Sequence, residues 1–99
     1  MSLRVEVDRA RLAAFCKVNG VHRLAVFGSA LRDDFRPDSD VDVLIEFEPG
    51  RTPGLRFFGM QEELSRLFAR SVDLHTPASL STYFRSQVLS EAEDQYVAA

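Results

Sequence analysis

Three aspartates lie in apolar segments where sheet packing alone gives no reason for them. Asp40 and Asp42 open the run DVDVLIEF, and Asp73 lies inside the apolar segment SVDLHT. Aspartate is a poor strand residue. Because side chains alternate across a strand, Asp40 and Asp42 are expected on one face, about 7 Å apart. A divalent cation such as Mg²⁺, which prefers oxygen ligands, would relieve their repulsion. The alternative to a cation site is a strand edge whose two charges are simply solvated, and a D-x-D pattern taken by itself favours this alternative.

A Gly-Ser pair, Gly28-Ser29, ends the preceding apolar run RLAVF. Glycine lets the backbone approach a ligand closely, and the unpaired N–H groups at the start of a helix bind phosphate oxygens. Ser29 adds a hydroxyl, and Arg32, one turn further on, is placed to reach the same anion. The simpler interpretation of the pair is a helix cap.

Taken together, these features favour a phosphoryl-transfer site. If the strand carrying Asp73 lies beside the strand carrying Asp40 and Asp42, three carboxylates converge as a two-metal site requires. Asp73 would then hold the second metal or accept a proton from the attacking hydroxyl.

A small α/β fold is expected to position these residues. The patterns predict helices over 9–18, 55–70 and 78–92 (the last in two pieces), a short helix over 29–34, strands over 23–27, 41–47 and 71–76, and a frayed edge strand over 95–97. The fold class is therefore a small mixed sheet flanked by helices.

Two apolar helix faces are expected to form the core against this sheet. The first helix, capped by Asp8, contributes Leu12, Phe15, Cys16 and Val18, and the helix over 55–70 contributes Phe57, Met60, Leu64, Leu67 and Phe68. Cys16 is expected to be a buried core residue with no reactive role. Phe58 lies off the apolar stripe and is a candidate for contact with a partner.

Composition limits the class of protein. The 99 residues are 45 % hydrophobic, which suits a single domain over 1–99. Twelve basic and fifteen acidic side chains argue against bulk binding to nucleic acid. A single cysteine excludes an internal disulfide and fits a reducing cytosol. The charged N-terminal stretch and the lack of an apolar run of about 18 residues predict a cytoplasmic protein without a membrane segment.

The motif Gly28-Ser29, ten residues, then Asp40-x-Asp42 resembles the signature of the nucleotidyltransferase superfamily that includes DNA polymerase beta. Chain length and the later VDLHTP segment narrow the resemblance to minimal nucleotidyltransferases of the MNT antitoxin type. This resemblance implies that ATP is the substrate and that Mg²⁺ binds at two positions. The residues it implies are Asp40, Asp42 and Asp73 as catalytic residues and metal ligands, and Gly28, Ser29, Arg32 and Ser39 as nucleotide-binding residues.

The same resemblance implies a partner, because relatives are paired with helical HEPN toxins and some transfer AMP to a toxin tyrosine. A complex of the two proteins is then expected. A chain of 99 residues has little room for an acceptor site of its own, so the acceptor would come from the partner. Asp33 departs from the family pattern, which commonly has glycine there, and its charge would weaken nucleotide binding. No aromatic side chain is obviously placed to stack on a base.

Two other functions remain open at this point. A binding module that neutralises a toxin by covering it would need no chemistry, and a small metal-dependent phosphatase or cation-binding domain would not need the Gly-Ser turn. His75 lies two residues after Asp73, on the same strand face; it either approaches the site or is a solvated strand end. His22 has no evident partner.

Overall fold

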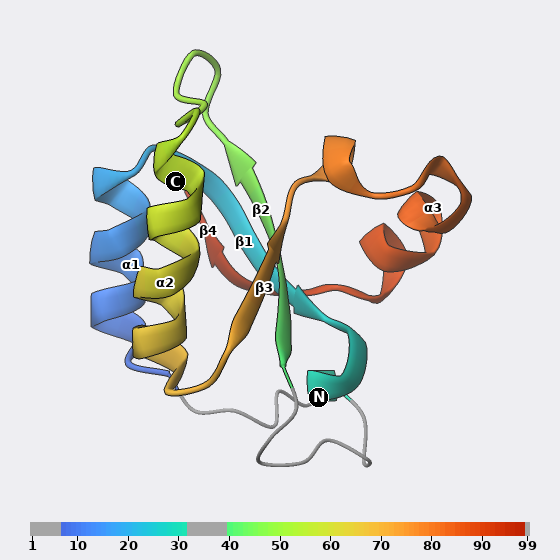
Figure 1. Ribbon diagram of the computed structural model, residues 1–99, viewed down its shortest axis with the longest axis horizontal. Coiled ribbons are helices and arrows are strands. Elements are labelled where there is room, and N and C mark those ends of the chain that lie inside the picture. Colours follow the sequence, from blue (N-terminus) through green and yellow to red (C-terminus); the bar gives the residue numbers. More distant parts are fainter. Residues whose placement is uncertain (1–6, 32–39, 99) are drawn as a thin grey trace.

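The protein forms one mixed four-stranded sheet in the order β3-β2-β1-β4 (Figure 1). The computed structural model describes residues 7–31 and 40–98. Strand β1 pairs antiparallel with β2 on one side and with β4 on the other, whereas β2 and β3 are parallel. The strands are β1 (Val21–Phe27), β2 (Val41–Phe47), β3 (Val72–His75) and β4 (Glu93–Val97).

Helices lie on both sides of this sheet, which confirms the predicted fold class. Helices α1 and α2 lie side by side against one face, and α3 lies on the other side (Figure 1). Two single turns of 3-10 helix, η1 and η2, follow β1 and β3. The bounds are α1 (Arg9–Val18), η1 (Gly28–Leu31), α2 (Arg56–Phe68), η2 (Pro77–Ser79) and α3 (Thr82–Glu91). None of the helices in the described ranges is long and apolar enough to cross a bilayer.

Most element boundaries differ from the predicted ones by one or two residues. Strand β1 begins at Val21, two residues early, because it pairs there with Phe47 at the end of β2. Strand β4 begins at Glu93, since pairing with β1 extends the edge strand toward the N-terminus. The expected helix over 29–34 is a 3-10 turn over Gly28–Leu31, and positions 32–34 lie outside the described residues.

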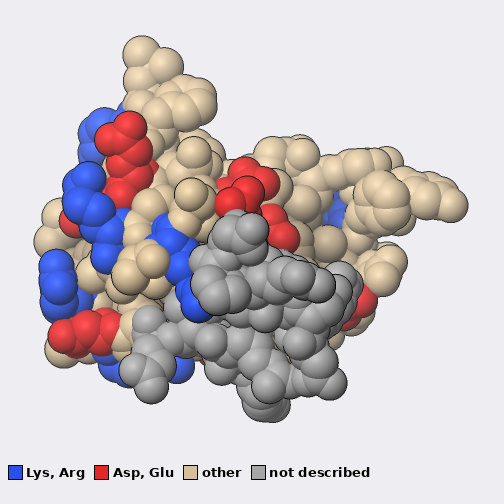
Figure 2. Space-filling view, turned by 60° about the horizontal axis from the view of Figure 1, so that its bottom comes forward, with Lys and Arg blue, Asp and Glu red and all other residues tan. Residues whose placement is uncertain are grey.

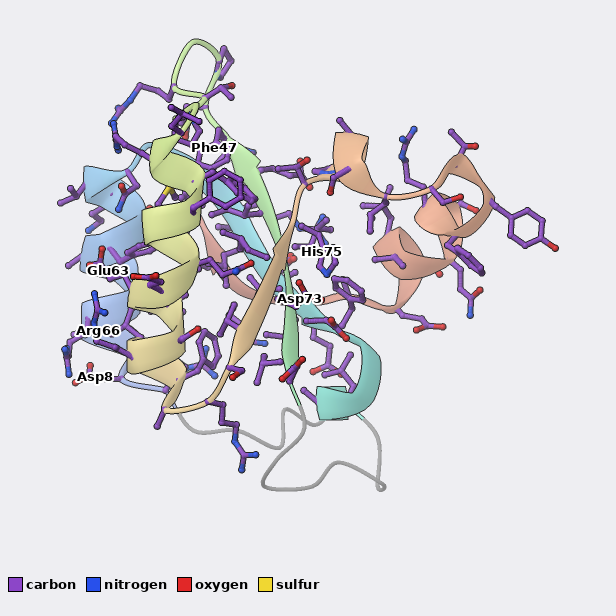
Figure 3. The ribbon with its side chains drawn as sticks, in the orientation of Figure 1. Asp8, Phe47, Glu63, Arg66, Asp73 and His75 are labelled. Atoms are coloured by element: carbon purple, nitrogen blue, oxygen red, sulfur yellow. The ribbon has the colours of Figure 1, made fainter. Side chains whose placement is uncertain are left out.

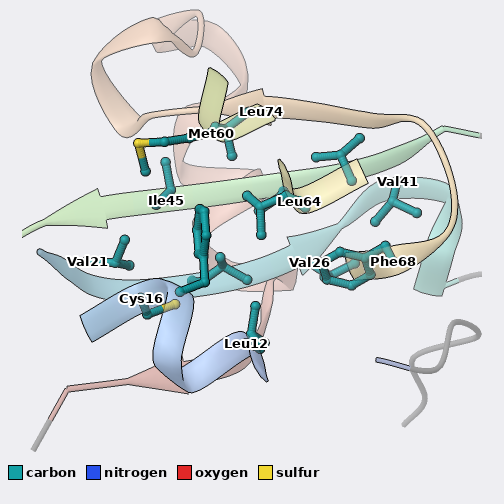
Figure 4. Packing of buried hydrophobic residues seen from close by; sticks show 14 of the residues in the cluster. Leu12, Cys16, Val21, Val26, Val41, Ile45, Met60, Leu64, Phe68 and Leu74 are labelled. Atoms are coloured by element: carbon teal, nitrogen blue, oxygen red, sulfur yellow. The ribbon is translucent and has the colours of Figure 1, made fainter. Parts of the chain in front are cut away.

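The core lies between the α1–α2 layer and the sheet (Figure 4). From α2 it takes Met60, Leu64 and Phe68, which are buried at the predicted spacing, while Phe57 and Leu67 are partly buried. The strands contribute alternate residues to it: Leu24 and Val26 from β1, Val41, Val43 and Ile45 from β2, and Val72 and Leu74 from β3. Val21 at the start of β1 also belongs to the core. The positions between the alternate core residues, among them Arg23, Asp42 and Asp73, face away from α1 and α2, and this side of the sheet is called the second face.

Helix α1 packs through Leu12, Phe15 and Cys16, as predicted, and the Asp8 carboxylate accepts hydrogen bonds from two amides of its first turn. Burial raises the pKa of the Cys16 thiol to about 12, so this side chain is an inert core residue. The expectation for Val18 was wrong, since it is 74 % exposed. The side of α1 that packs on the sheet recurs about every seven residues, so after Leu12 it passes through Asn19 and leaves Val18 exposed.

The outer edge of β3 is held by α2. The Ser65 hydroxyl accepts a hydrogen bond from the Val72 amide at 3.0 Å, and the Gln61 amide oxygen accepts one from the Leu74 amide at 2.9 Å. These two amides flank Asp73 and would otherwise be unpaired groups of an edge strand. Helix α2 therefore fixes the backbone on both sides of Asp73.

We expect Leu64→Ala to lower the free energy of unfolding by about 2–5 kcal/mol, because the substitution leaves a cavity between α2 and the sheet. Leu64 is fully buried, whereas Leu55, just before α2, is 87 % exposed. The matched change Leu55→Ala should stay within about 0.5 kcal/mol of the wild type. Urea titration of both variants measures the difference, and equal losses would contradict the packing described.

Candidate functional site

Three neighbouring strands bring the candidate residues together at one end of the sheet. Phe27, the last residue of β1, pairs with Asp42 in β2, and Asp42 pairs with Asp73 in β3. Val41, Val43, Val72 and Leu74 point into the core, so Asp42 and Asp73 point to the second face. His75, two residues after Asp73, shares that face, and Figure 3 shows the two labelled side chains along β3. The parallel β2–β3 pair thus places two carboxylates directly opposite each other.

Asp42, Asp73 and His75 form a compact group of three possible ligands. Each offers one donor atom, and the three atoms lie within 4.8 Å of one another. The Nε2 atom of His75 lies 3.6 Å from Oδ1 of Asp42 and 3.5 Å from Oδ2 of Asp73. Both separations are too long for a well-formed hydrogen bond. This nitrogen is buried and has no hydrogen-bond partner among the described residues.

The electrostatics of the group favour a bound cation. Burial raises the pKa of Asp42; the attraction of His75 opposes this rise, and the negative charges of Asp73 and Asp40 add to it. Asp42 keeps only 30 % of its side chain exposed, whereas Asp73 keeps 56 %. A group of acidic side chains is visible near the centre of the space-filling view (Figure 2). A divalent cation would offset both the lost hydration of Asp42 and the repulsion between the carboxylates.

Gly28 is required where β1 ends. Its φ of +76° lies in the left-handed region, which side chains rarely adopt. A Cβ atom added at this position would lie 2.5 Å from Oδ2 of Asp42. Only glycine therefore lets the β1–η1 backbone pass this close to the Asp42 carboxylate, and the space it leaves borders the site.

The other predicted site residues are placed as follows. Asp40 is exposed and directly precedes β2; its charge acts on Asp42, but it is not one of the three clustered ligands. Ser29 belongs to the η1 turn, while its side chain, together with Arg32, Asp33 and Ser39, lies outside the described residues.

The two histidines differ from expectation in different ways. The sequence allows two interpretations of His75, and the structure places it inside the group; its shared face with Asp73 is the signal in the sequence. His22 was expected to have no partner, which is wrong. It lies in β1, and its Nδ1 contacts the Glu48 carboxylate at 3.4 Å, because Glu48 follows the end of the paired strand β2.

The donor set is suited to a divalent metal. Two carboxylates are ligands for Mg²⁺, and an imidazole whose buried nitrogen has no partner in the described part of the chain is a further ligand for a divalent ion. Because Gly28 has no side chain, nothing from that position covers the Asp42 carboxylate oxygen. These residues could together hold a divalent cation.

Comparison with known sequences identifies close relatives. The family described as "Nucleotidyltransferase domain" matches residues 9–94. The protein adenylyltransferase MntA of Thermococcus cleftensis is 40 % identical over 73 residues, covering 73 % of this chain and 72 % of the relative. A Methanocaldococcus jannaschii protein named as a protein adenylyltransferase, MJ0435, is 33 % identical over 89 residues, covering 90 % of this chain and 94 % of the relative.

Solved structures share the fold. A minimal nucleotidyltransferase is 38 % identical with a TM-score of 0.70, covering 86 % of each chain. A toxin-antitoxin structure with AMP-PNP has a TM-score of 0.73 at 17 % identity, covering 93 % of this chain and 75 % of that one. The structure of a tri-AMPylated Shewanella oneidensis HEPN toxin in complex with MNT antitoxin has a TM-score of 0.58 at 18 % identity. The match covers 91 % of this chain and 70 % of that one. At such identities the last two likenesses show the fold alone.

We expect Gly28→Ala to displace the Asp42 carboxylate and to weaken binding of divalent cations. The substitution also forces a side chain into a left-handed backbone, at about 1–2 kcal/mol. Gly50→Ala is the matched control, because Gly50 has a φ of +78° with nothing within 4 Å of an added Cβ. Calorimetric titration with Mg²⁺ and thermal unfolding of both variants separate the two effects. Equal loss of cation binding in both variants would contradict the close approach.

A second prediction concerns the cost of the Asp42 charge. Because the pKa of Asp42 is raised in the folded chain, the folded state holds this proton more tightly than the unfolded state. Stability from this group therefore falls as pH rises through the folded pKa, and the ionised carboxylate opposes folding at neutral pH without a cation. Asp42→Asn should raise the unfolding temperature in a chelating buffer at pH 7, and the gain should shrink near about pH 3, where aspartates are protonated. A lower unfolding temperature at pH 7 would be the contrary result.

Proposed function

This chain belongs to the nucleotidyltransferase domain family and is a nucleotidyltransferase, and from that premise we propose that it transfers AMP from ATP to a HEPN-type toxin, with Mg²⁺ as the metal. The observation that supports this most is the register of β2 and β3, which puts Asp42 opposite Asp73 beside the Gly28 turn. Sequence relatives named protein adenylyltransferase support AMP as the transferred group. The HEPN partner is proposed by analogy with the structural neighbours.

The reaction is a displacement at the α-phosphorus of ATP. A hydroxyl oxygen of the partner forms a bond to that phosphorus, the bond to the pyrophosphate oxygen breaks, and pyrophosphate leaves. Asp73, the more exposed of the two paired aspartates, accepts the hydroxyl proton. The amides of the Gly28-Ser29 turn bind the triphosphate and hold the α-phosphorus in line with the attacking oxygen. Arg32 and Ser39 are proposed to contact the same phosphates.

Asp40, Asp42 and Asp73 are the proposed Mg²⁺ ligands. Together they would hold a Mg²⁺ ion, whose positive charge would offset the negative charge of the phosphates and lower the pKa of the attacking hydroxyl. Asp40 would complete the oxygen ligands from its position directly before β2, where it is exposed.

Access for a partner comes from the second face. Asp73 keeps 56 % of its side chain exposed, and α1 and α2 occupy the opposite side of the sheet (Figure 1). A side chain of a bound protein can therefore reach the Asp73 carboxylate from solvent. The toxin would supply both the acceptor and much of the specificity.

A non-enzymatic antitoxin is the second candidate. Helix α3 has no buried residue, and it exposes Tyr83, Phe84 and Leu89. Such apolar side chains suit contact with a partner that needs no chemistry. In that case the carboxylates would be idle, and covering the toxin would be sufficient to neutralise it.

We expect Asp42→Asn to reduce AMP transfer by at least about a thousandfold, because the variant removes the ligand at the centre of the group. The measurement is incorporation of label from α-labelled ATP into a HEPN-type toxin. Asp8→Asn is the matched control: Asp8 is an exposed helix cap, and asparagine caps a helix about as well. The control should transfer AMP at the wild-type rate.

The two candidate functions give opposite results in one variant. The adenylyltransferase account predicts that the double variant Asp40→Asn/Asp42→Asn leaves the toxin active. If this variant still neutralised the toxin fully and left no label on it, the transfer account would be wrong and neutralisation by covering the toxin would be supported.

A further inference from the structure

We propose that His75 is itself a metal ligand, and that its imidazole gives the site formed with Asp42 and Asp73 a preference for Mn²⁺ over Mg²⁺. This inference rests on the proposed function, because it concerns the cation that the same site uses. It adds a nitrogen ligand to a set that otherwise consists of carboxylate oxygens.

The donor atoms lie close enough together to bind one ion after a small movement of the side chains. Ligands at about 2.1 Å from a six-coordinate ion lie about 3.0 Å apart when adjacent, and about 3.4 Å apart in a tetrahedral arrangement. The Nε2 atom of His75 lies 3.5 Å and 3.6 Å from the two carboxylate oxygens, and all three donor atoms fall within 4.8 Å. Direct hydrogen bonds would require shorter contacts. The three donor atoms therefore lie slightly wider apart than bound ligands, and closer contact with a common ion needs a shift of only about 0.5 Å in their separations.

The surroundings of His75 hold its Nε2 atom toward the carboxylates. Its backbone pairs with Leu44 of β2, and its ring lies against the ring of Phe27, with centroids 5.4 Å apart. The side chain keeps 26 % of its surface exposed, yet Nε2 itself is buried and has no hydrogen-bond partner within 7–31 and 40–98. A buried polar nitrogen without a partner is unfavourable, and a metal ion would satisfy it.

The choice of metal follows from the donor. Mg²⁺ favours oxygen ligands, whereas an imidazole nitrogen binds transition metals better. Mn²⁺ accepts carboxylates and imidazole alike. In this site, replacing the imidazole nitrogen by an amide oxygen should weaken the binding of Mn²⁺ and leave the binding of Mg²⁺ nearly unchanged.

The direct test is pulsed electron paramagnetic resonance of the wild-type chain loaded with Mn²⁺ alone. Electron spin echo envelope modulation detects a nitrogen atom bound to the ion. Nitrogen coupling is expected in the wild type and in His22→Gln, and none is expected in His75→Gln. His22, the other histidine of the chain, lies in β1 beside Glu48, and its removal controls for imidazole binding elsewhere. A wild-type spectrum without nitrogen coupling would overturn the proposal, whatever the variants do.

Calorimetric titration tests the preference separately. Loss of a ligand in His75→Gln should raise the Mn²⁺ dissociation constant by about 10- to 100-fold and the Mg²⁺ dissociation constant by less than about 3-fold. His22→Gln should change neither. Equal weakening of both metals, or unchanged Mn²⁺ binding, would overturn the proposal. Circular dichroism of each variant verifies that it is folded.

These binding measurements use neither ATP nor a toxin, so they can refute the role of His75 without refuting the proposed function, and the reverse. Nitrogen-bound Mn²⁺ in a chain that transfers no AMP would uphold the ligand and refute the transfer. Transfer that depends on Asp42, in a chain whose Mn²⁺ carries no nitrogen ligand, would do the reverse.

Discussion

The pairing of β2 with β3 imposes an electrostatic constraint on the whole structure, because it holds Asp42 and Asp73 opposite each other on one face. The pair cannot easily move apart. Val41, Val43, Val72 and Leu74 are buried on the other side of the same strands, and the amides flanking Asp73 are bonded to Ser65 and Gln61 of α2. Burial of Asp42 adds to the unfavourable energy of its charge. The core thus stabilises an arrangement that the carboxylates by themselves would not adopt, as is common at functional sites.

The treatment of charge along the second face distinguishes the site from its surroundings. Toward the other end of β1, Arg23 contacts Glu46 at 2.8 Å and also contacts Asp94 of the edge strand β4. Those acidic groups have a permanent basic partner. In the described part of the chain, the ion-pair contacts of Asp42 and Asp73 are with His75 alone, at 3.5 Å or more. The ion pairs of Arg23 therefore link neighbouring strands, whereas the carboxylates of Asp42 and Asp73 are available to bind a ligand.

Several features could be predicted from the sequence because they depend on local rules. Alternation along SVDLHT predicted that Asp73 and His75 share a strand face, and the Asp8 cap and the stripe of α2 followed from residue type and helical spacing. The parallel register that pairs Asp42 with Asp73 depends on tertiary packing. The sequence could therefore predict that the carboxylates converge only if the two strands are neighbours. Gly28 was noted for phosphate binding, but its close approach to Asp42 requires coordinates. His75 was undervalued because a single histidine at a strand end carries little signal until its neighbours are known.

The most direct measurement is an anomalous difference map from crystals grown with Mn²⁺ and an ATP analogue whose α–β bridge cannot be cleaved. The account predicts a manganese peak between the side chains of Asp42 and Asp73, with the phosphate chain against the backbone of the Gly28-Ser29 turn. A map in which the metal and the nucleotide bind elsewhere, with both carboxylates in contact only with solvent, would contradict it.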